Sequence, residues 1–121
     1  MTKLIDATLL KSASYINGKW LPKKENNVKV TNPATGDVIT VLNLACEQDA
    51  KNAIIDANKA FQQWKNTSIK TRFKLLKQWF DLIVANKQDL ATLMTLEQGK
   101  PITESLGEIE YGASYVEWFA E

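Results

Sequence analysis

The residue best suited to covalent chemistry in this 121-residue sequence is its one cysteine, Cys46. A thiol becomes a nucleophile when a neighbouring base favours the thiolate, and histidine is the usual base. The sequence contains no histidine, so it can build neither a Ser-His-Asp triad nor a Cys-His pair by itself. The common zinc arrangements are excluded for the same reason, and we expect no metal site. We interpret Cys46 as a small residue at a strand-to-helix junction, buried as cysteines outside disulfides usually are.

A second candidate is the segment from Glu97 to Pro101, whose glycine and lysine could contact a phosphate group. One glycine and one lysine fall short of a phosphate-binding loop, which needs several glycines at fixed spacing. The simpler interpretation is a helix end followed by a new helix. Gly99 then supplies the unusual backbone angle after the first helix, and Pro101 is the first residue of the next.

The charges are almost balanced, with 15 basic and 14 acidic residues and a net charge of +1. Such a balance gives no field that would attract nucleic acid or an anionic membrane, and neither partner is expected. No window approaches the ~20 apolar residues of a membrane span. The first eleven residues lack the apolar core of a signal peptide, so we expect a cytoplasmic location. One helical stretch carries several cations, which we interpret as a solvated face: Lys70, Arg72, Lys74 and Lys77.

Residues from about 15 to 42 show the alternation and the turn residues of a β-hairpin and short strands. Asn17-Gly18 between apolar residues is the strongest short hairpin signal, because both residues tolerate a positive φ. Pro33 and Gly36 mark a second turn, in which the proline fixes one angle and the glycine supplies an unusual one.

After Cys46 the pattern changes to the 3.6-residue period of amphipathic helices. Four helices are predicted at about residues 47–64, 69–85, 88–98 and 101–120, with Thr67 or Ser68 as the N-cap of the second. The wide apolar face of the second helix predicts burial on more than one side. The length suits one domain that buries roughly 60–70% of its unfolded surface.

The last predicted helix is apolar around much of its circumference. One apolar stripe runs along its whole length, and Tyr111, Tyr115 and Trp118 form a second stripe at the same helical spacing. The rest of the chain could cover only one side of such a helix. The sequence therefore predicts a chain that is truncated or that binds a partner, with the aromatic residues either in the core or along a cavity.

Four short motifs occur in a fixed order along the chain. They are Ile16-Asn17-Gly18-Lys19-Trp20, Asn32-Pro33-Ala34-Thr35-Gly36, Ala60-Phe61-Gln62-Gln63-Trp64 and Leu96-Glu97-Gln98-Gly99-Lys100-Pro101. In this order they resemble the opening of the aldehyde dehydrogenase superfamily, over about residues 15–121. The longer run from Met94 to Pro101, with residues 107–109 and 117–121, resembles the bacterial succinate-semialdehyde dehydrogenases of that family. The closely related glutarate-semialdehyde enzymes share most of this run.

This resemblance implies an α/β fold of aldehyde dehydrogenase type and the oxidation of succinate semialdehyde to succinate with NAD or NADP. In the family a cysteine thiolate attacks the aldehyde carbon, hydride passes to the nicotinamide, and a glutamate activates water that releases the acid from the thioester. These groups, the cofactor-binding segments and the oligomerisation hairpin lie in later parts of the family chain. Residues 1–121 are therefore expected to form the N-terminal portion of the cofactor-binding domain, inactive alone and without catalytic or cofactor-binding residues.

The resemblance also places the last helix near the aldehyde tunnel of the family, with Gly107 and Tyr111 closest to it. Tyr115 and Trp118 on the same helix are further tunnel candidates. The implied partners are a small aldehyde, the remainder of the enzyme chain and further copies in a homo-oligomer. Five residues are expected to have structural roles: Gly18, Pro33, Gly36, Gly99 and Pro101.

Several alternatives stay open at this point. The aldehyde could be glutarate semialdehyde or another substrate of the family, and the sequence does not choose between NAD and NADP. The chain could instead be a stand-alone helical interaction module that docks through its aromatic helix. An unrelated small enzyme is disfavoured, because the sequence lacks histidine and clustered carboxylates.

Overall fold

The computed structural model describes residues 4–22 and 25–121. Part of the first eleven residues, where no signal peptide was expected, therefore lies outside the description. A short 3-10 turn, η1 (Ala7–Leu9), comes first. Two antiparallel pairs follow: β1 (Tyr15–Ile16) with β2 (Lys19–Trp20), and β3 (Asn27–Thr31) with β4 (Val38–Asn43). The helices are α1 (Glu47–Trp64), α2 (Ile69–Ala85), α3 (Lys87–Gln98) and α4 (Ile102–Ala120). The prediction of short strands followed by four helices is confirmed.

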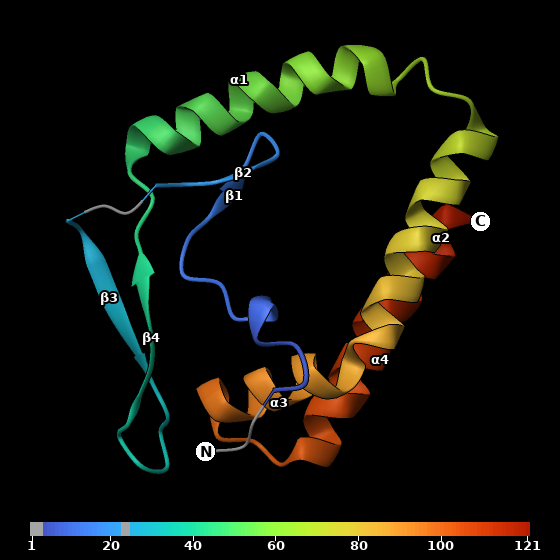
Figure 1. The fold of residues 1–121 in the computed structure, drawn as a ribbon. Helices are drawn as coiled ribbons and strands as arrows, with labels where there is room; N and C mark the ends of the chain where they lie inside the picture. The colour runs from blue at the N-terminus through green and yellow to red at the C-terminus, as the bar shows by residue number, and fades with distance from the viewer. Residues whose placement is uncertain (1–3, 23–24) are drawn as a thin grey trace.

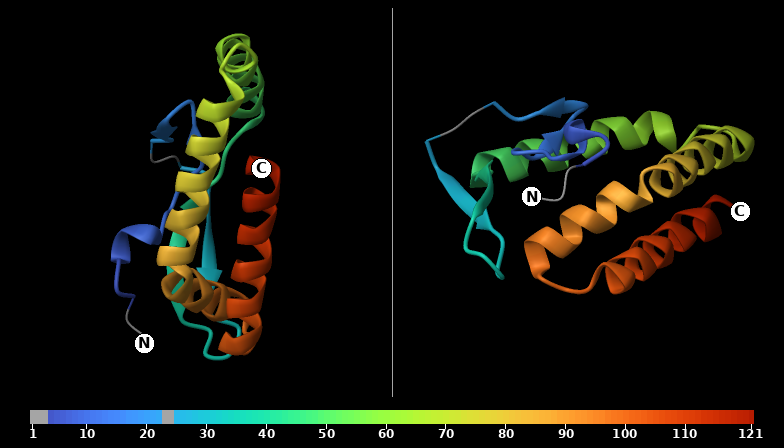
Figure 2. Two further views of the ribbon diagram at one scale, coloured as in Figure 1. Left: turned by 90° about the vertical axis from the view of Figure 1, so that its right-hand side faces the viewer. Right: turned by 60° about the horizontal axis from the view of Figure 1, so that its bottom comes forward.

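The helices form an open frame, and the first hairpin lies near α1 (Figures 1 and 2). α1 crosses one end, α2 runs down one side, and α4 returns alongside α2, as all three views show (Figures 1 and 2). Helix α4 packs against both α2 and α3. The β3–β4 pair stands away from the α2–α4 pair (Figure 1).

Both predicted turns have the expected backbone. Asn17 and Gly18 both take positive φ, at 51° and 73°, and this turn pairs Tyr15 with Trp20. In the second turn Gly36 has φ of 77°, and its N–H donates to the Asn32 carbonyl at 2.8 Å. The Asn32 side chain also accepts a hydrogen bond from the Ala34 N–H at 2.9 Å, which closes the turn around Pro33.

The turn between α3 and α4 differs in one detail from the prediction. Gly99 is left-handed, with φ of 76°, and its N–H donates to the Thr95 carbonyl at 2.8 Å, so it ends α3 as expected. Pro101, however, is the N-cap of α4 and not its first helical residue, because its ψ of 142° is extended. Its carbonyl accepts from the Glu104 and Ser105 amides, and the helix itself begins at Ile102. The N-cap of α2 is Ser68, whose hydroxyl accepts from the Thr71 N–H.

Cys46 lies where the sequence predicts it, between β4 and α1, but it is exposed and not buried. The reason is its role as the N-cap of α1. Its N–H donates to the Asp49 carboxylate at 2.7 Å, which fixes the start of the helix at the surface.

The buried core is small and lies around α3 and α4. Among the described residues the buried apolar side chains are all alanines, Ala91, Ala113 and Ala120. Large apolar residues stay exposed, and among them are several on α2, which packs along α4 but is open elsewhere. The prediction that α2 is buried on more than one side is therefore wrong within this chain. The exposed surface of 8970 Å² means that folding buries about 55% of the surface of an unfolded chain of this mass, below the expected range.

An acidic residue that the sequence did not single out joins the N-terminal segment to α3. Asp89, on α3, is 95% buried, and its two carboxylate oxygens accept from the Ile5 N–H at 2.9 Å and the Asp6 N–H at 2.7 Å. A buried carboxylate is tolerated where hydrogen bonds replace its hydration. Asp89 therefore anchors the N-terminal segment to α3.

Candidate functional site

The outward face of α4, opposite the stripe that packs on α2 and α3, carries the predicted aromatic residues. Tyr111 is 65% exposed and Trp118 is 76% exposed, and Tyr115 is also exposed. With Ser114 and Phe119 they line a groove of about 340 Å³. The interpretation of these residues as core aromatics is wrong for this chain, because the structure places them on the face that neither α2 nor α3 covers.

The two tyrosines of this face are held together. Their rings meet edge to face, with centroids 5.0 Å apart at 89°, and their hydroxyl oxygens are 2.5 Å apart. The hydrogen bond between the two hydroxyls, with a smaller effect of burial, raises the pKa of the Tyr115 hydroxyl above 10.0. The pair is therefore an ordered aromatic wall of the groove.

Gly107 lies one helical turn before Tyr111, and it leaves the surface beside the tyrosines open. A Cβ atom built at Gly107 would meet no described heavy atom within 4 Å. A glycine inside a helix costs about 1 kcal/mol relative to alanine, and nothing in the described structure requires one here. The structure thus places the four tunnel candidates on helix α4 and leaves open space over Gly107.

The five structural candidates lie elsewhere, and two of them touch. A Cβ atom built on Gly99 would lie 2.8 Å from the Cγ atom of Pro33, so the β3–β4 turn packs directly against the end of α3. Gly18 belongs to the first hairpin, Gly36 to the second turn, and Pro101 to the start of α4. These residues set backbone geometry and take no part in the groove.

The lining of the groove suits contact with a small apolar group, but it carries no activated nucleophile for covalent chemistry. Its lining consists of aromatic rings and one serine, and the Ser114 hydroxyl donates to the Tyr111 carbonyl at 2.7 Å. Cys46 lies at the start of α1, outside this lining. Within the described residues no group of three or more metal-binding side chains is found. None of the described helices is long and apolar enough to cross a membrane.

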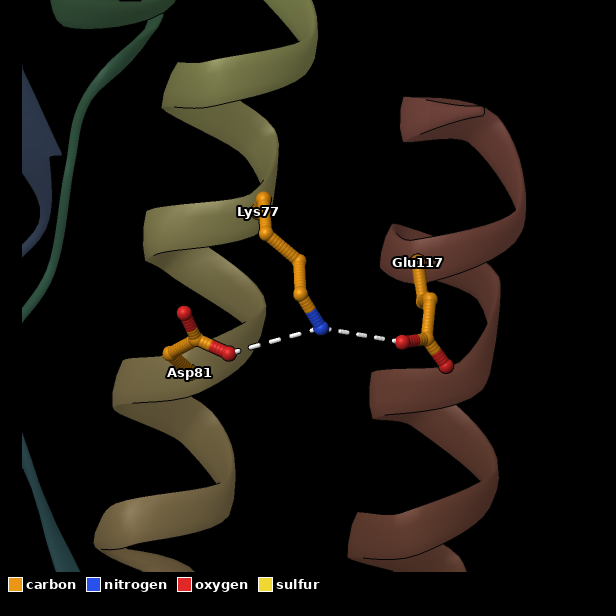
Figure 3. Close-up of polar contacts among 3 residues, drawn as sticks. All are labelled: Lys77, Asp81 and Glu117. Carbon is orange, nitrogen blue, oxygen red and sulfur yellow. Dashed lines mark hydrogen bonds and ion pairs between the residues drawn. The ribbon is translucent and has the colours of Figure 1, made fainter.

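Sequence reasoning missed a polar cluster that joins α2 to α4 (Figure 3). The Lys77 Nζ atom lies 3.0 Å from the Glu117 carboxylate, 3.5 Å from the Asp81 carboxylate and 4.0 Å from the centre of the Phe80 ring. The hydrogen bond with Glu117 raises the pKa of Lys77 above 10.5. Lys77 therefore differs from a simple solvated cation, because its side chain, which is 38% exposed, also bridges α2 and α4. The four-residue spacing of Lys77 and Asp81 on a predicted helix could have indicated their ion pair. The contact with Glu117 on α4 could not be found in this way, because it depends on how the two helices pack.

The comparisons with known proteins agree with this fold. The profile of the Aldehyde dehydrogenase family matches residues 20–121, and the chain belongs to that family.

Among its relatives is the glutarate-semialdehyde dehydrogenase of Pseudomonas putida, 47% identical over 98% of this chain and 25% of that protein. Another is the NADP(+) succinate-semialdehyde dehydrogenase of Escherichia coli, 43% identical over 98% of this chain and 25% of that protein. A crystal structure of an aldehyde dehydrogenase from Brucella melitensis biovar abortus is similar with a TM-score of 0.94 and 45% identity, over 99% of this chain and 25% of that one. The chain thus spans about a quarter of the length of the relatives it matches.

Proposed function

We propose that this chain is the N-terminal portion of the cofactor-binding domain of an NAD(P)-dependent aldehyde dehydrogenase. The proposed reaction is the oxidation of a semialdehyde to the acid, and the preferred candidate substrate is succinate semialdehyde. The similarity to the semialdehyde dehydrogenases of Pseudomonas putida and Escherichia coli supports the substrate class. Glutarate semialdehyde is the alternative that the first of these relatives favours.

The observation that carries the proposal is the outward face of α4. Its aromatic groove and the open surface over Gly107 suit one wall of a passage for a small aldehyde. Aromatic walls with few polar groups exclude water, which protects a reactive thioester from premature hydrolysis. In the proposed enzyme Gly107 gives the aldehyde room, and Tyr111, Tyr115 and Trp118 shape the passage.

Three of the four described helices begin in a way that does not suit the phosphates of a dinucleotide. Helices α1, α3 and α4 carry acidic residues in their first turns, and a carboxylate there disfavours a bound phosphate. We therefore propose that NAD or NADP, which would accept the hydride, is held by residues other than these. The catalytic cysteine is likewise assigned to another part of the enzyme, since Cys46 caps α1 at the surface.

A chimaera tests the proposal. This chain replaces the matching segment of the Pseudomonas putida glutarate-semialdehyde dehydrogenase, and oxidation of succinate and glutarate semialdehydes is followed by NAD(P)H absorbance. The chimaera is expected to be active, whereas the 121-residue chain alone is expected to give no turnover. A folded but inactive chimaera, or turnover by the chain alone, would contradict the proposal.

Variants of the chimaera test the passage itself. Tyr111→Ala and Gly107→Leu are expected to change KM and the relative kcat/KM for aldehydes of different size, and to leave the KM for NAD(P) unchanged. The reason is that both positions face the proposed passage and neither lies near a phosphate site. Ile54→Ala, an exposed apolar position on α1, is the matched control and should change none of these constants. Unaltered kinetics of both variants with every aldehyde would refute the assignment.

A further inference from the structure

The hydroxyls of Tyr111 and Tyr115 together carry two hydrogens, and the hydrogen bond between them uses only one. One hydroxyl of the pair donates and the other accepts. Within residues 4–22 and 25–121 the two hydroxyls make no other hydrogen bond. The pair therefore keeps one O–H group that is able to donate to a ligand.

Tyr111 is the better placed of the two tyrosines to present this O–H group. It is the more exposed of the pair, and it follows Gly107 by one helical turn, where the surface is open. The raised pKa of the Tyr115 hydroxyl agrees with a bond in which Tyr115 keeps its proton and donates it to Tyr111. A hydroxyl that accepts one hydrogen bond is polarised, and it becomes a better donor of a second one.

The groove offers a ligand few other polar contacts. The Ser114 hydroxyl is already donated to the Tyr111 carbonyl, and the remaining lining side chains are aromatic, those of Trp118 and Phe119 beside the two tyrosines. A hydrogen bond to an ionised acceptor is roughly twice as strong as one between neutral groups. A carboxylate therefore gains more from this O–H group than a neutral oxygen does.

The acidic residues next to Tyr111 in the sequence of α4 do not stand as free charges. Glu110 forms an ion pair with Lys87, and Glu108 forms one with Lys100. These two lysines come from α3 and from the turn that follows it. A carboxylate that approaches Tyr111 thus meets paired glutamates there, which lowers the repulsion between like charges.

We infer that the Tyr111 hydroxyl determines specificity by donating a hydrogen bond to a carboxylate of the aldehyde substrate, and that Tyr115 positions this hydroxyl. The inference rests on the proposed function, in which a semialdehyde passes along this face of α4. Succinate semialdehyde has the required chemistry, because it carries a carboxylate at the end opposite its aldehyde group.

Tyrosine-to-phenylalanine variants of the active chimaera test this contact, because they remove one oxygen and keep the ring. The quantity measured is kcat/KM for succinate semialdehyde divided by kcat/KM for butanal, which has the same four carbons but no carboxylate. Tyr111→Phe is expected to lower this ratio by roughly tenfold or more, chiefly through a higher KM for succinate semialdehyde. Tyr115→Phe should lower the ratio less, since it keeps the donor and removes only its orienting partner.

Tyr15→Phe is the matched control, because Tyr15 is an exposed tyrosine on β1, outside the groove. It should leave the ratio unchanged. An unchanged ratio in Tyr111→Phe overturns the inference while the activity of the chimaera still supports the proposed function. A fall of equal size in Tyr111→Phe and Tyr15→Phe overturns it as well.

A binding measurement tests the same contact without turnover. Saturation-transfer NMR follows butyrate, which carries the carboxylate but no aldehyde, on the folded chimaera. Tyr111→Phe is expected to weaken the binding of butyrate by a factor similar to the change in the ratio, and Tyr15→Phe is expected to leave it unchanged. Equal binding of butyrate to the chimaera and to Tyr111→Phe overturns the inference. Weaker binding to Tyr111→Phe in a chimaera that oxidises no aldehyde would support the carboxylate contact and reject the proposed reaction.

Discussion

At the scale of single residues, Gly36 and Gly99 form a matched pair. Their φ angles are 77° and 76°, but a Cβ atom at Gly36 would meet no described heavy atom within 4 Å, whereas one at Gly99 would lie 2.8 Å from Pro33. The backbone angle therefore explains the glycine at residue 36, while at residue 99 a tertiary contact adds a second reason.

This difference gives a prediction for alanine substitutions. Gly36→Ala should lower the free energy of unfolding by about 1–2 kcal/mol, the cost of a left-handed alanine. Gly99→Ala should lower it by a further ~1–3 kcal/mol, because the new methyl group overlaps Pro33. Urea denaturation followed by circular dichroism measures both.

The control removes the neighbour and keeps the angle. In a Pro33→Ala background, Gly99→Ala should cost little more than Gly36→Ala, since the ring atom that it meets is gone. Equal losses for the two glycine variants in the original background would contradict the contact.

The same pair shows which residue-level features could be predicted from sequence. The positive φ angles of Gly18, Gly36 and Gly99 follow from local turn chemistry, and the structure has all three. The contact of Gly99 with Pro33 could not be predicted, because it depends on how a β-turn and a helix end, far apart in the chain, meet in space. The exposure of Cys46 was missed because its N-cap role outweighed the general tendency of cysteine to be buried.

At the scale of elements, Lys77 and Glu117 connect the two helices that pack most extensively, α2 and α4 (Figure 3). The pKa of Lys77 is raised in the folded chain, chiefly by its hydrogen bond with Glu117. A raised folded-state pKa means that the contact stabilises the fold fully below the ordinary lysine value of 10.5. This stabilisation is lost as the pH rises through the raised pKa.

We expect the chain to lose stability at alkaline pH, and we expect part of this loss to depend on the Lys77–Glu117 pair. The free energy of unfolding should fall as the pH is raised beyond 10.5, and Glu117→Gln should reduce this fall because it removes the main cause of the shift. Lys87→Met removes an ion pair between α3 and α4 and is the control for a general effect of charge. An alkaline fall of the same size in the chain and in the Glu117→Gln variant would disprove the role of the pair.

The helices themselves could be predicted almost to the residue, because their apolar period and cap residues are local properties. Ser68 caps α2 and Gly99 ends α3, as the sequence indicates. Their packing partners could not be predicted in the same way. The apolar faces of α1 and α2 look alike in sequence, yet α2 packs extensively on α4 while Ile54 and Ile55 on α1 stay exposed. The aromatic stripe of α4 was located correctly, but whether it was core or surface depended on that packing.

At the scale of the whole molecule, the small core predicts an unusual heat capacity of unfolding. A compact domain of this length is expected to show about 1.5–1.8 kcal/mol/K. This chain should fall clearly below that value, because large apolar residues such as Trp79 and Trp118 are exposed already in the folded state. Differential scanning calorimetry of the chain measures this heat capacity. A value within the compact range would show that the frame in Figure 1 closes further in solution.

Composition and length predicted that folding buries an ordinary fraction of the chain's surface. This prediction about the whole molecule was wrong. Composition counts apolar residues but does not say which of them meet. The order of strands and helices and the family could be recognised, because motifs such as Asn32-Pro33-Ala34-Thr35-Gly36 preserve local geometry that the structure shows directly.

The carboxylate of Asp89 has a consequence for the order in which the chain is made. The amides of Ile5 and Asp6 leave the ribosome early, but their acceptor is 84 and 83 residues further along. The segment therefore stays unfixed throughout the synthesis of both hairpins, α1 and α2. A ribosome that pauses before α3 would leave the segment around Ile5 and Asp6 sensitive to proteases, and one that passes α3 would protect it. The segment around Ile5 and Asp6 is thus secured only after residue 89 has been made.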